Sequence, residues 1–520
     1  MLSASLQQPS KRRSRFLGSV LWSWLGVVVS VFAGILLSPI TIRKLGAEGY
    51  GVWIIVITLA DYLGLMDLGF RSATIKYTAH YRATGEPGKV NETINTAVLY
   101  SSGVTAFTIV GTLLLFRFAA RFENISPAYH RRFEILLIAV GIASGAGAVF
   151  YIFESSIGAF QRFDITSRIS ILSTAVRSFG MAAALLAGYG LLGMGAVLMA
   201  SLALTYSLDY IAIRRVFPEF RLAPSLATFA MFRQMLAYGV HTFLAAISQL
   251  LLNQSAPVLI AHFLPTTAYA GYYGMAYRVP CYSVDLVSRV GYITSSHSAE
   301  LAARNDLGAI AAMGIYINRY CFAMFAPMAM AMIVYGKELF RAWLTPEMAT
   351  MSAPLLPVLA TGITLGIAAQ FNSGSILYGL GKHKGYAISL AVEAALCVAG
   401  LYLAIPRYGI LGAACVVSAL LVLNRGLVAS WLLSRAVHVG MAAYLRGIYV
   451  SPFLVAIPTM SMSLWVKRRW LPGSNLREVL AGGALLAIVY YAAAFFFCLE
   501  SGHRKALVNW LRGRLHSAGA

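Results

Sequence analysis

The sequence predicts an all-α integral membrane protein, with about fourteen transmembrane helices arranged as two six-helix lobes, two C-terminal helices and a central cavity. Three observations predict this fold class. Hydrophobic residues make up 59% of the 520-residue chain and charged residues only 12%, which is more apolar surface than a water-soluble core can bury. Apolar windows long enough to cross a bilayer recur along the whole chain. Short motifs also repeat at a nearly constant spacing, which indicates an internal duplication.

The predicted spans follow one another closely, and most of the gaps carry turn residues such as Gly85, Pro87 and Pro346. The first apolar run is too long for a signal-peptide core and lacks a clear cleavage site, so we interpret it as the first span. We expect no soluble domain and no long linker. The fourteen windows lie near residues 16–40, 50–70, 94–118, 133–158, 166–188, 191–213, 236–261, 268–290, 311–336, 353–380, 386–405, 410–434, 446–466 and 478–499.

The duplication is visible in motifs that recur about 220 residues later. The matching positions are Gly49-Tyr50-Gly51 with Gly271-Tyr272-Tyr273, Gly69 with Gly291, Arg82 with Arg304, and Tyr189 to Gly193 with Tyr408 to Gly412. Because each copy has six spans, both insert with the same orientation, related by an axis along the membrane normal. We therefore expect an N-terminal lobe at 1–215, a C-terminal lobe at 216–435, and two further helices with a basic tail at 436–520.

The charge of the chain sets its expected orientation. Its 41 Lys and Arg exceed its 19 Asp and Glu, giving a net charge of +22. In a soluble protein this excess would suggest a nucleic-acid partner, but here most basic residues lie in the short gaps that a cytoplasmic N-terminus places inside. We therefore expect no nucleic-acid partner and both termini in the cytoplasm. The basic run 467–469 falls outside in this scheme, which leaves the topology of the last two helices open.

The remaining motifs argue against an enzyme. The G-x-G-x-x-G pattern at Gly188, Gly190 and Gly193 joins two membrane helices, so it lacks the strand that a dinucleotide site requires. The sequence contains no P-loop motif, no metal-ligand cluster and no hydrolytic triad, and its five cysteines lie in apolar stretches without metal or redox spacing. We expect no cofactor and no bound metal. A membrane polymerase or ligase would need a larger extracytoplasmic loop than this chain offers.

Ionisable residues inside the spans are the best candidates for a functional site. Each costs roughly 2.5 to 3.5 kcal/mol in lipid, so such residues usually face a cavity or a partner. Because guanidinium suits bidentate phosphate contacts, the deep arginines favour an anionic substrate; structural ion pairs between helices are the alternative. The basic candidates are Arg177, Arg278, Arg319 and Arg425, and the acidic residues are Asp61, Asp67, Glu154, Asp209, Asp285 and Glu393.

Spacing groups several of these residues on common helix faces. Arg278 and Asp285 are seven residues apart, which returns them to nearly the same face. Gln249 and Asn253 are four residues apart in the seventh span. The second span carries three further charged residues, namely Asp61, Asp67 and Arg71, of which the last two are four residues apart near its cytoplasmic end.

The segment from Leu45 to Trp53, followed by Met66-Asp67-Leu68-Gly69-Phe70 and the loop from Arg82 to Asn95, resembles the Wzx-type polysaccharide biosynthesis transporters. These flippases belong to the multidrug/oligosaccharidyl-lipid/polysaccharide superfamily. The resemblance is sharp over the N-terminal third and rests elsewhere on hydropathy and the repeat. It implies twelve or more helices in two lobes around a central cavity, in agreement with the duplication.

The resemblance also implies a function. An undecaprenyl-pyrophosphate-linked oligosaccharide would move from the cytoplasmic to the periplasmic leaflet of a bacterial inner membrane by alternating access, for the assembly of a surface polysaccharide such as lipopolysaccharide O-antigen or exopolysaccharide. A polysaccharide polymerase is a candidate partner. The expected substrate-binding residues are Arg278, Arg319, Arg425, Arg177, Asn253 and Gln249, and the expected coupling or gating residues are Asp285, Glu393, Asp61, Asp67 and Arg71. A cation-coupled drug or metabolite antiporter of the same superfamily is the alternative.

Overall fold

A computed structural model of the chain describes residues 9–64, 69–119, 124–505 and 508–509. Over these ranges the secondary structure is helical, with no strand, so the predicted all-α class is confirmed. The chain forms two compact units, Met1–Gly274 and Met275–Ala520. The predicted lobe boundaries at residues 215 and 435 were derived from the sequence repeat and not from the compactness of the structure. They stay a prediction.

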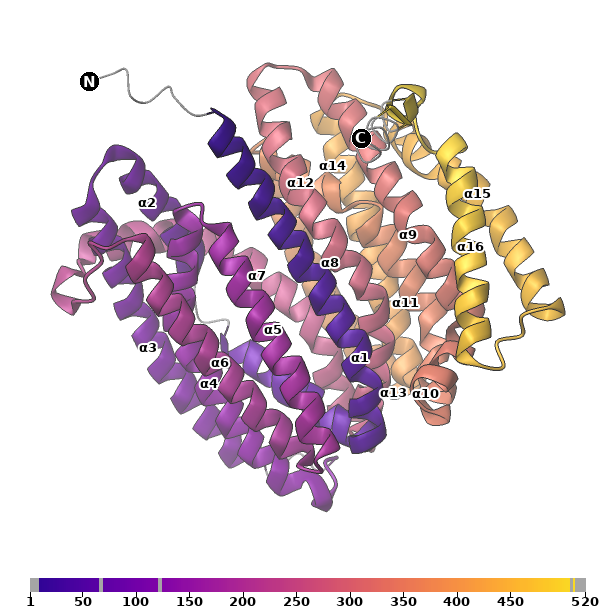
Figure 1. Cartoon of the computed structure of the whole chain (residues 1–520), viewed down its shortest axis with the longest axis horizontal. Helices are drawn as coiled ribbons and strands as arrows, with labels where there is room; N and C mark the ends of the chain where they lie inside the picture. The colour runs from indigo at the N-terminus through magenta and orange to yellow at the C-terminus, as the bar shows by residue number, and fades with distance from the viewer. Residues whose placement is uncertain (1–8, 65–68, 120–123, 506–507, 510–520) are drawn as a thin grey trace, which may run out of the picture. The chain divides into compact units, whose positions relative to one another are not determined.

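The N-terminal unit is a helical bundle in which α3, α4, α5 and α6 lie side by side (Figure 1). Its core gathers apolar side chains of several helices, among them Phe70, Ile94, Ile152 and Met235. The elements are α1 (Pro9–Gly64), α2 (Phe70–Thr84), α3 (Pro87–Ala119), α4 (Pro127–Ala159), α5 (Phe163–Leu186), α6 (Gly190–Val216), the 3-10 turn η2 (Pro224–Leu226), α7 (Phe229–Phe263) and the first turns of α8 (Ala268–Ala303).

The C-terminal unit is organised around α9, which packs against α15 and α16 as well as against α10, α11 and α12. Two π-helical segments, η4 and η5, contact each other inside this unit. Beyond α8 its elements are α9 (Leu307–Trp343), α10 (Pro346–Met351), η3 (Ala353–Leu355), α11 (Leu356–Gly362), η4 (Ile363–Ala368), α12 (Phe371–Gly379), α13 (Lys384–Leu420), η5 (Leu421–Val428), α14 (Ala429–Ala436), α15 (Met441–Arg469) and α16 (Leu476–Phe497).

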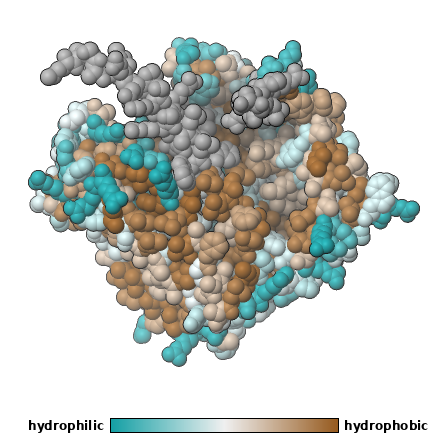
Figure 2. Space-filling model, viewed as in Figure 1, coloured by the Kyte–Doolittle hydropathy of each residue, from teal (hydrophilic) through white to brown (hydrophobic). Residues whose placement is uncertain are grey.

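Ten helical ranges among the described residues are long and apolar enough to cross a membrane. Two of them contain a glycine with non-helical backbone angles, Gly46 in α1 and Gly409 in α13, so each joins two helices across a kink. The long helices α7 and α8 lie outside the ten ranges. The predicted count of fourteen therefore stays a prediction. Over the helices of the N-terminal unit, hydrophobic side chains form a broad band between more hydrophilic ends on the visible face (Figure 2).

The repeated glycine motifs meet each other in the N-terminal unit. A Cβ atom at Gly51 would lie 1.9 Å from the carbonyl oxygen of Thr267, and one at Gly271 would lie 2.5 Å from that of Ala47 and 3.2 Å from the Gly51 nitrogen. Thr267 also donates its hydroxyl to the Glu48 carbonyl at 3.3 Å. Only glycine allows two backbones to approach this closely. Gly51 and Gly271 thus lie on the two sides of one close backbone crossing.

Candidate functional site

Ionisable side chains gather in the N-terminal unit at a group that we call the N-terminal polar cluster, formed by Asp61, Arg71, Tyr151, Glu154, Arg177 and Asp209. Arg71 at the start of α2 forms an ion pair with Glu154 of α4, with 3.1 Å between nitrogen and oxygen. Its guanidinium also lies over the Tyr151 ring, 4.3 Å from the centroid. Asp67, four residues before Arg71, lies outside the described residues. Among the described residues, Glu154 is thus a carboxylate partner of Arg71.

Asp61 belongs to a polar layer between α1 and α7. Gln254 donates to the Asp61 carboxylate at 2.8 Å and accepts from the Thr58 hydroxyl at 3.1 Å. The two predicted α7 residues, Gln249 and Asn253, have exposed side chains. The sequence predicts Gln249 and Asn253 but misses the adjacent Gln254, which the structure shows donating to Asp61.

Arg177 lies in the middle of α5 and differs from the other deep arginines. Its side chain is half-buried, and it lies within electrostatic range of the Tyr151 hydroxyl. Among the described residues it has no carboxylate within 4 Å. Asp209 of α6 is 3% exposed and likewise has no ion-pair or hydrogen-bond partner there, although Glu154 and Arg71 lie within electrostatic range. The N-terminal polar cluster thus contains a cation and an acid that no direct contact neutralises.

The C-terminal unit contains a second group, which we call the C-terminal charged cluster: Arg278, Tyr282, Asp285, Glu393, Asn424 and Arg425. Arg278 and Asp285, which their spacing places on one face of α8, form an ion pair at 3.3 Å, and both side chains are nearly half exposed. The Arg278 guanidinium also lies 4.8 Å from the centroid of the Tyr282 ring. This pair is therefore open to solvent or to a ligand.

The second pair of this cluster is buried. Arg425, in the π-helical segment η5, lies 3.6 Å from the Glu393 carboxylate of α13, and their side chains are 10% and 0% exposed. The neighbouring Asn424 donates to the same carboxylate at 2.7 Å. A π-helical turn is wider than an α-helical one and often marks a functional position; here two consecutive side chains reach one acid from it.

Arg425 of the buried pair lies close to the part of α8 that carries the exposed pair Arg278–Asp285. Cys281 lies within electrostatic range of Arg278, Asp285 and Arg425, and Arg425 also interacts with Tyr277. The C-terminal charged cluster consequently contains two arginines and two carboxylates, which form the two pairs Arg278–Asp285 and Arg425–Glu393. Its arginines are compensated, in contrast to Arg177.

Arg319 lies elsewhere in the C-terminal unit. Its guanidinium pairs at 3.0 Å with Glu500, which follows α16, and its side chain is 16% exposed. Next to it, the Tyr320 hydroxyl is 2.7 Å from a ring nitrogen of His503 and accepts from the Glu500 backbone nitrogen at 3.3 Å. Arg319 therefore fastens the segment after α16 to α9. Glu500 had no motif around it, so no sequence signal pointed to this pairing.

Solved membrane transporters share this fold. The lipid II flippase MurJ in an inward closed conformation superposes with a TM-score of 0.68 at 11% identity, over 92% of this chain and 99% of that one. An inward-facing MATE family multidrug resistance transporter gives 0.65 at 11% identity, over 80% and 98%. A MOP superfamily transporter from Pyrococcus furiosus gives 0.56 at 12% identity, over 82% and 96%. At these identities the likeness concerns the fold.

Sequence comparison identifies the family. An uncharacterized membrane protein of Methanocaldococcus jannaschii is 23% identical over 207 residues, which is 39% of this chain and 40% of that protein. The profile of the family described as polysaccharide biosynthesis protein matches residues 16–281, just over half of the 520 residues. This match confirms the resemblance that the N-terminal motifs indicate. The chain therefore belongs to the polysaccharide biosynthesis protein family and has the fold of MOP superfamily transporters.

Proposed function

We propose that this protein is a flippase that moves an undecaprenyl-pyrophosphate-linked oligosaccharide from the cytoplasmic to the periplasmic leaflet of a bacterial inner membrane. The oligosaccharide would then enter the assembly of a surface polysaccharide, O-antigen or exopolysaccharide. The family match supports the pathway, and the fold shared with a lipid II flippase supports the type of transport. Alternating access would expose the site to each leaflet in turn while the prenyl chain stays in lipid.

The observation that carries the proposal is the uncompensated Arg177. A cation in the middle of a span is costly without a counter-ion, and Arg177 has no carboxylate within 4 Å among the described residues. A pyrophosphate would supply the missing negative charge and accept the two parallel hydrogen bonds that guanidinium offers. Arg278 is the second contact that we propose, because its pair with Asp285 is nearly half exposed and can open toward an anion.

The other predicted residues have supporting roles in this proposal. Gln249 and Asn253 present amides on the exposed side of α7, where they can bind sugar hydroxyls. Arg425 and Arg319 hold Glu393 and Glu500 respectively. Asp61, Asp285 and Glu393 are the acids that we propose for coupling. The membrane potential favours the direction, since an anion that leaves the negative cytoplasm gains about 2.3 kcal/mol per charge at 100 mV.

A cation-coupled drug antiporter is the second candidate, because the N-terminal polar cluster also contains the buried Asp209 and a MATE transporter shares the fold. Such a protein would export cationic compounds.

Deleting the gene separates the two functions. The flippase proposal predicts that polyprenyl-linked oligosaccharide accumulates in the inner leaflet and that a surface polysaccharide is lost, with unchanged resistance to cationic drugs. Complementation with the intact gene is the control. An intact surface polysaccharide in a strain without a redundant transporter, together with increased drug sensitivity, would overturn the proposal in favour of the antiporter.

A further inference from the structure

The connection between α6 and α7 is fastened to α3 by two asparagines. Asn91 donates to the Glu219 carbonyl at 3.0 Å and accepts from the Arg221 nitrogen at 2.8 Å. Asn95 donates to the Arg221 carbonyl at 2.7 Å and accepts from the Ala223 nitrogen at 2.8 Å. Both backbone groups of Arg221 are thus bonded to α3.

The spacing of the two asparagines explains the regular pattern. Four residues of an α-helix advance about 6.0 Å along its axis, and two residues of an extended strand advance about 6.6 Å. Side chains four residues apart on α3 therefore match backbone groups two residues apart on an extended segment. Each amide bonds a carbonyl and the N–H two residues later, which is what a neighbouring parallel strand would supply. We call residues 217–228, docked in this way, the strap.

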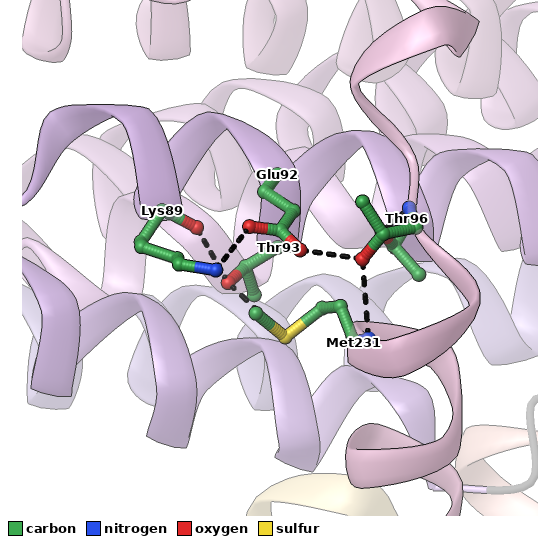
Figure 3. Close-up of polar contacts among 6 residues, drawn as sticks. Lys89, Glu92, Thr93, Thr96 and Met231 are labelled. Carbon is green, nitrogen blue, oxygen red and sulfur yellow. Dashed lines mark hydrogen bonds and ion pairs between the residues drawn. The ribbon is translucent and has the colours of Figure 1, made fainter.

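The far end of the strap is anchored as well. Thr228 caps α7 by accepting from the Met231 nitrogen at 3.2 Å, and its hydroxyl donates to the Glu92 carboxylate. Glu92 is in turn paired with Lys89 at 2.8 Å, and the Thr93 hydroxyl of α3 approaches the Met231 sulfur at 3.7 Å. Figure 3 shows these contacts between α3 and the start of α7. In addition, the Thr228 nitrogen donates to Thr96 at 3.2 Å.

Apolar contacts secure the strap between its two polar ends. Phe217 and Phe220 are 7% and 6% exposed, and they lie in the same hydrophobic cluster as Val90 and Ile94 of α3 and Met231 of α7. Polar and apolar contacts thus fix the strap over most of its length. A flexible tether between two lobes would show neither.

We propose that the strap is a rigid connection that stays docked on α3 and makes the start of α7 a part of the N-terminal unit. The N-terminal end of the seventh helix would then move with the first six helices, although the predicted duplication assigns it to the second copy. This proposal does not depend on which substrate is transported. It follows from the contacts of Asn91 and Asn95.

Limited trypsin digestion of the purified full-length protein tests the proposal at the Arg221–Leu222 bond. A protease must pull the chain into its own cleft, so cleavage requires the strap to open. We expect Arg221 to be cleaved at least tenfold more slowly than Arg304, an exposed residue in the turn after α8. The double variant Asn91→Ala/Asn95→Ala should raise cleavage at Arg221 at least tenfold and leave cleavage at Arg304 unchanged.

The matched control is Asn124→Ala, which removes an asparagine that donates to the carbonyls of Ala261 and His262 in the same unit. It should leave cleavage at Arg221 unchanged. Equal cleavage of Arg221 and Arg304 in the unmodified protein, or no acceleration in the double variant, would overturn the proposal. If the double variant loses its fold, Arg304 is also cleaved faster, and the two single variants then decide: faster cleavage confined to Arg221 supports the strap, and its absence refutes it.

Discussion

The two units treat their deep arginines in opposite ways. In the C-terminal unit, Arg278, Arg319 and Arg425 each lie within 4 Å of a carboxylate. In the N-terminal unit, Arg177 has no such partner among the described residues, and Asp209 of α6 is buried there without an ion pair or hydrogen bond to another described residue. Arginines inside the predicted spans therefore occur in two environments, with and without a carboxylate partner. A buried pair such as Arg425 with Glu393 stabilises the fold, whereas we propose that a ligand supplies the charge that Arg177 lacks.

The solvent exposure of each ion pair determines how much stability is lost when its arginine is removed. A buried pair cannot lose one member without stranding the other charge, and that costs ~3–5 kcal/mol. An exposed pair contributes ~0–1 kcal/mol, because water replaces the lost contact. Substituting each arginine in turn should therefore give a graded series of stabilities, measured for example as the midpoint of thermal unfolding in the same detergent.

The largest effect is expected for Arg425→Ala. The Glu393 carboxylate would remain fully buried with only the Asn424 amide to bind it, so we expect a loss of ~3–5 kcal/mol and a lower protein level. The double variant Arg425→Met/Glu393→Leu should recover most of this loss, because it removes both charges. Arg435→Ala, at an exposed position of α14, is the control. A single variant as stable as the control would contradict the role of the pair.

Arg319→Ala should have a smaller effect. Glu500 is half exposed and becomes hydrated when the arginine is removed, so we expect a loss of about 1 kcal/mol. The segment that carries Glu500 and His503 should also become more accessible, and hydrogen exchange of residues 500–505 would report this. Unchanged exchange in this segment would show that Arg319 does not fasten it to α9.

Arg278→Ala should change stability still less, by under ~1 kcal/mol, because both members of its pair are more than one-third exposed. Under the proposed function this variant should nevertheless lose surface polysaccharide export, and Arg278→Lys should recover part of it, since the charge survives without the bidentate fork. The double variant Arg278→Ala/Asp285→Ala separates the two roles. Restored export in the double variant would contradict the substrate-binding role of Arg278.

The smallest effect on stability is expected for Arg177→Ala. No ion pair is broken, and removing an uncompensated cation from a span relieves an insertion cost of roughly 2.5 to 3.5 kcal/mol. The midpoint of unfolding should therefore stay the same or rise. Val176→Ala, at the neighbouring exposed position of α5, controls for the loss of side-chain volume. A fall comparable to that of Arg425→Ala would mean that Arg177 has a structural partner.

The sequence was informative about the fold because hydropathy and turn residues act locally along the chain. It also placed Arg278 and Asp285 on one helix face, because seven residues return to nearly the same face, and the structure shows that they form an ion pair. Pairings between helices could not be predicted in this way. Arg71 with Glu154, Arg425 with Glu393 and Arg319 with Glu500 join residues 83, 32 and 181 positions apart, and no local pattern encodes such contacts.

The strap shows a second limit of sequence reasoning. Its residues lack periodicity and include Pro218 and Pro224, so they resemble any surface loop. The order comes from α3, where Asn91 and Asn95 match the spacing of an extended chain, and this match is visible only when both partners are placed. The close backbone contact between Gly51 and Gly271 was partly predictable from the sequence. The repeat matches Gly49 with Gly271 and Gly51 with Tyr273, and only the structure shows that Gly51 and Gly271 lie against each other.

The central claim is that an uncompensated Arg177 receives the pyrophosphate of a lipid-linked oligosaccharide. The most direct measurement reconstitutes the purified protein into vesicles that contain a fluorescent polyprenyl-pyrophosphate oligosaccharide and follows its appearance in the opposite leaflet with a membrane-impermeant quencher. The account predicts translocation by the unmodified protein, at least a tenfold slower rate for Arg177→Ala at equal stability, and partial recovery for Arg177→Lys. Full translocation by Arg177→Ala would contradict it, and no translocation by the unmodified protein would refute the flippase function itself.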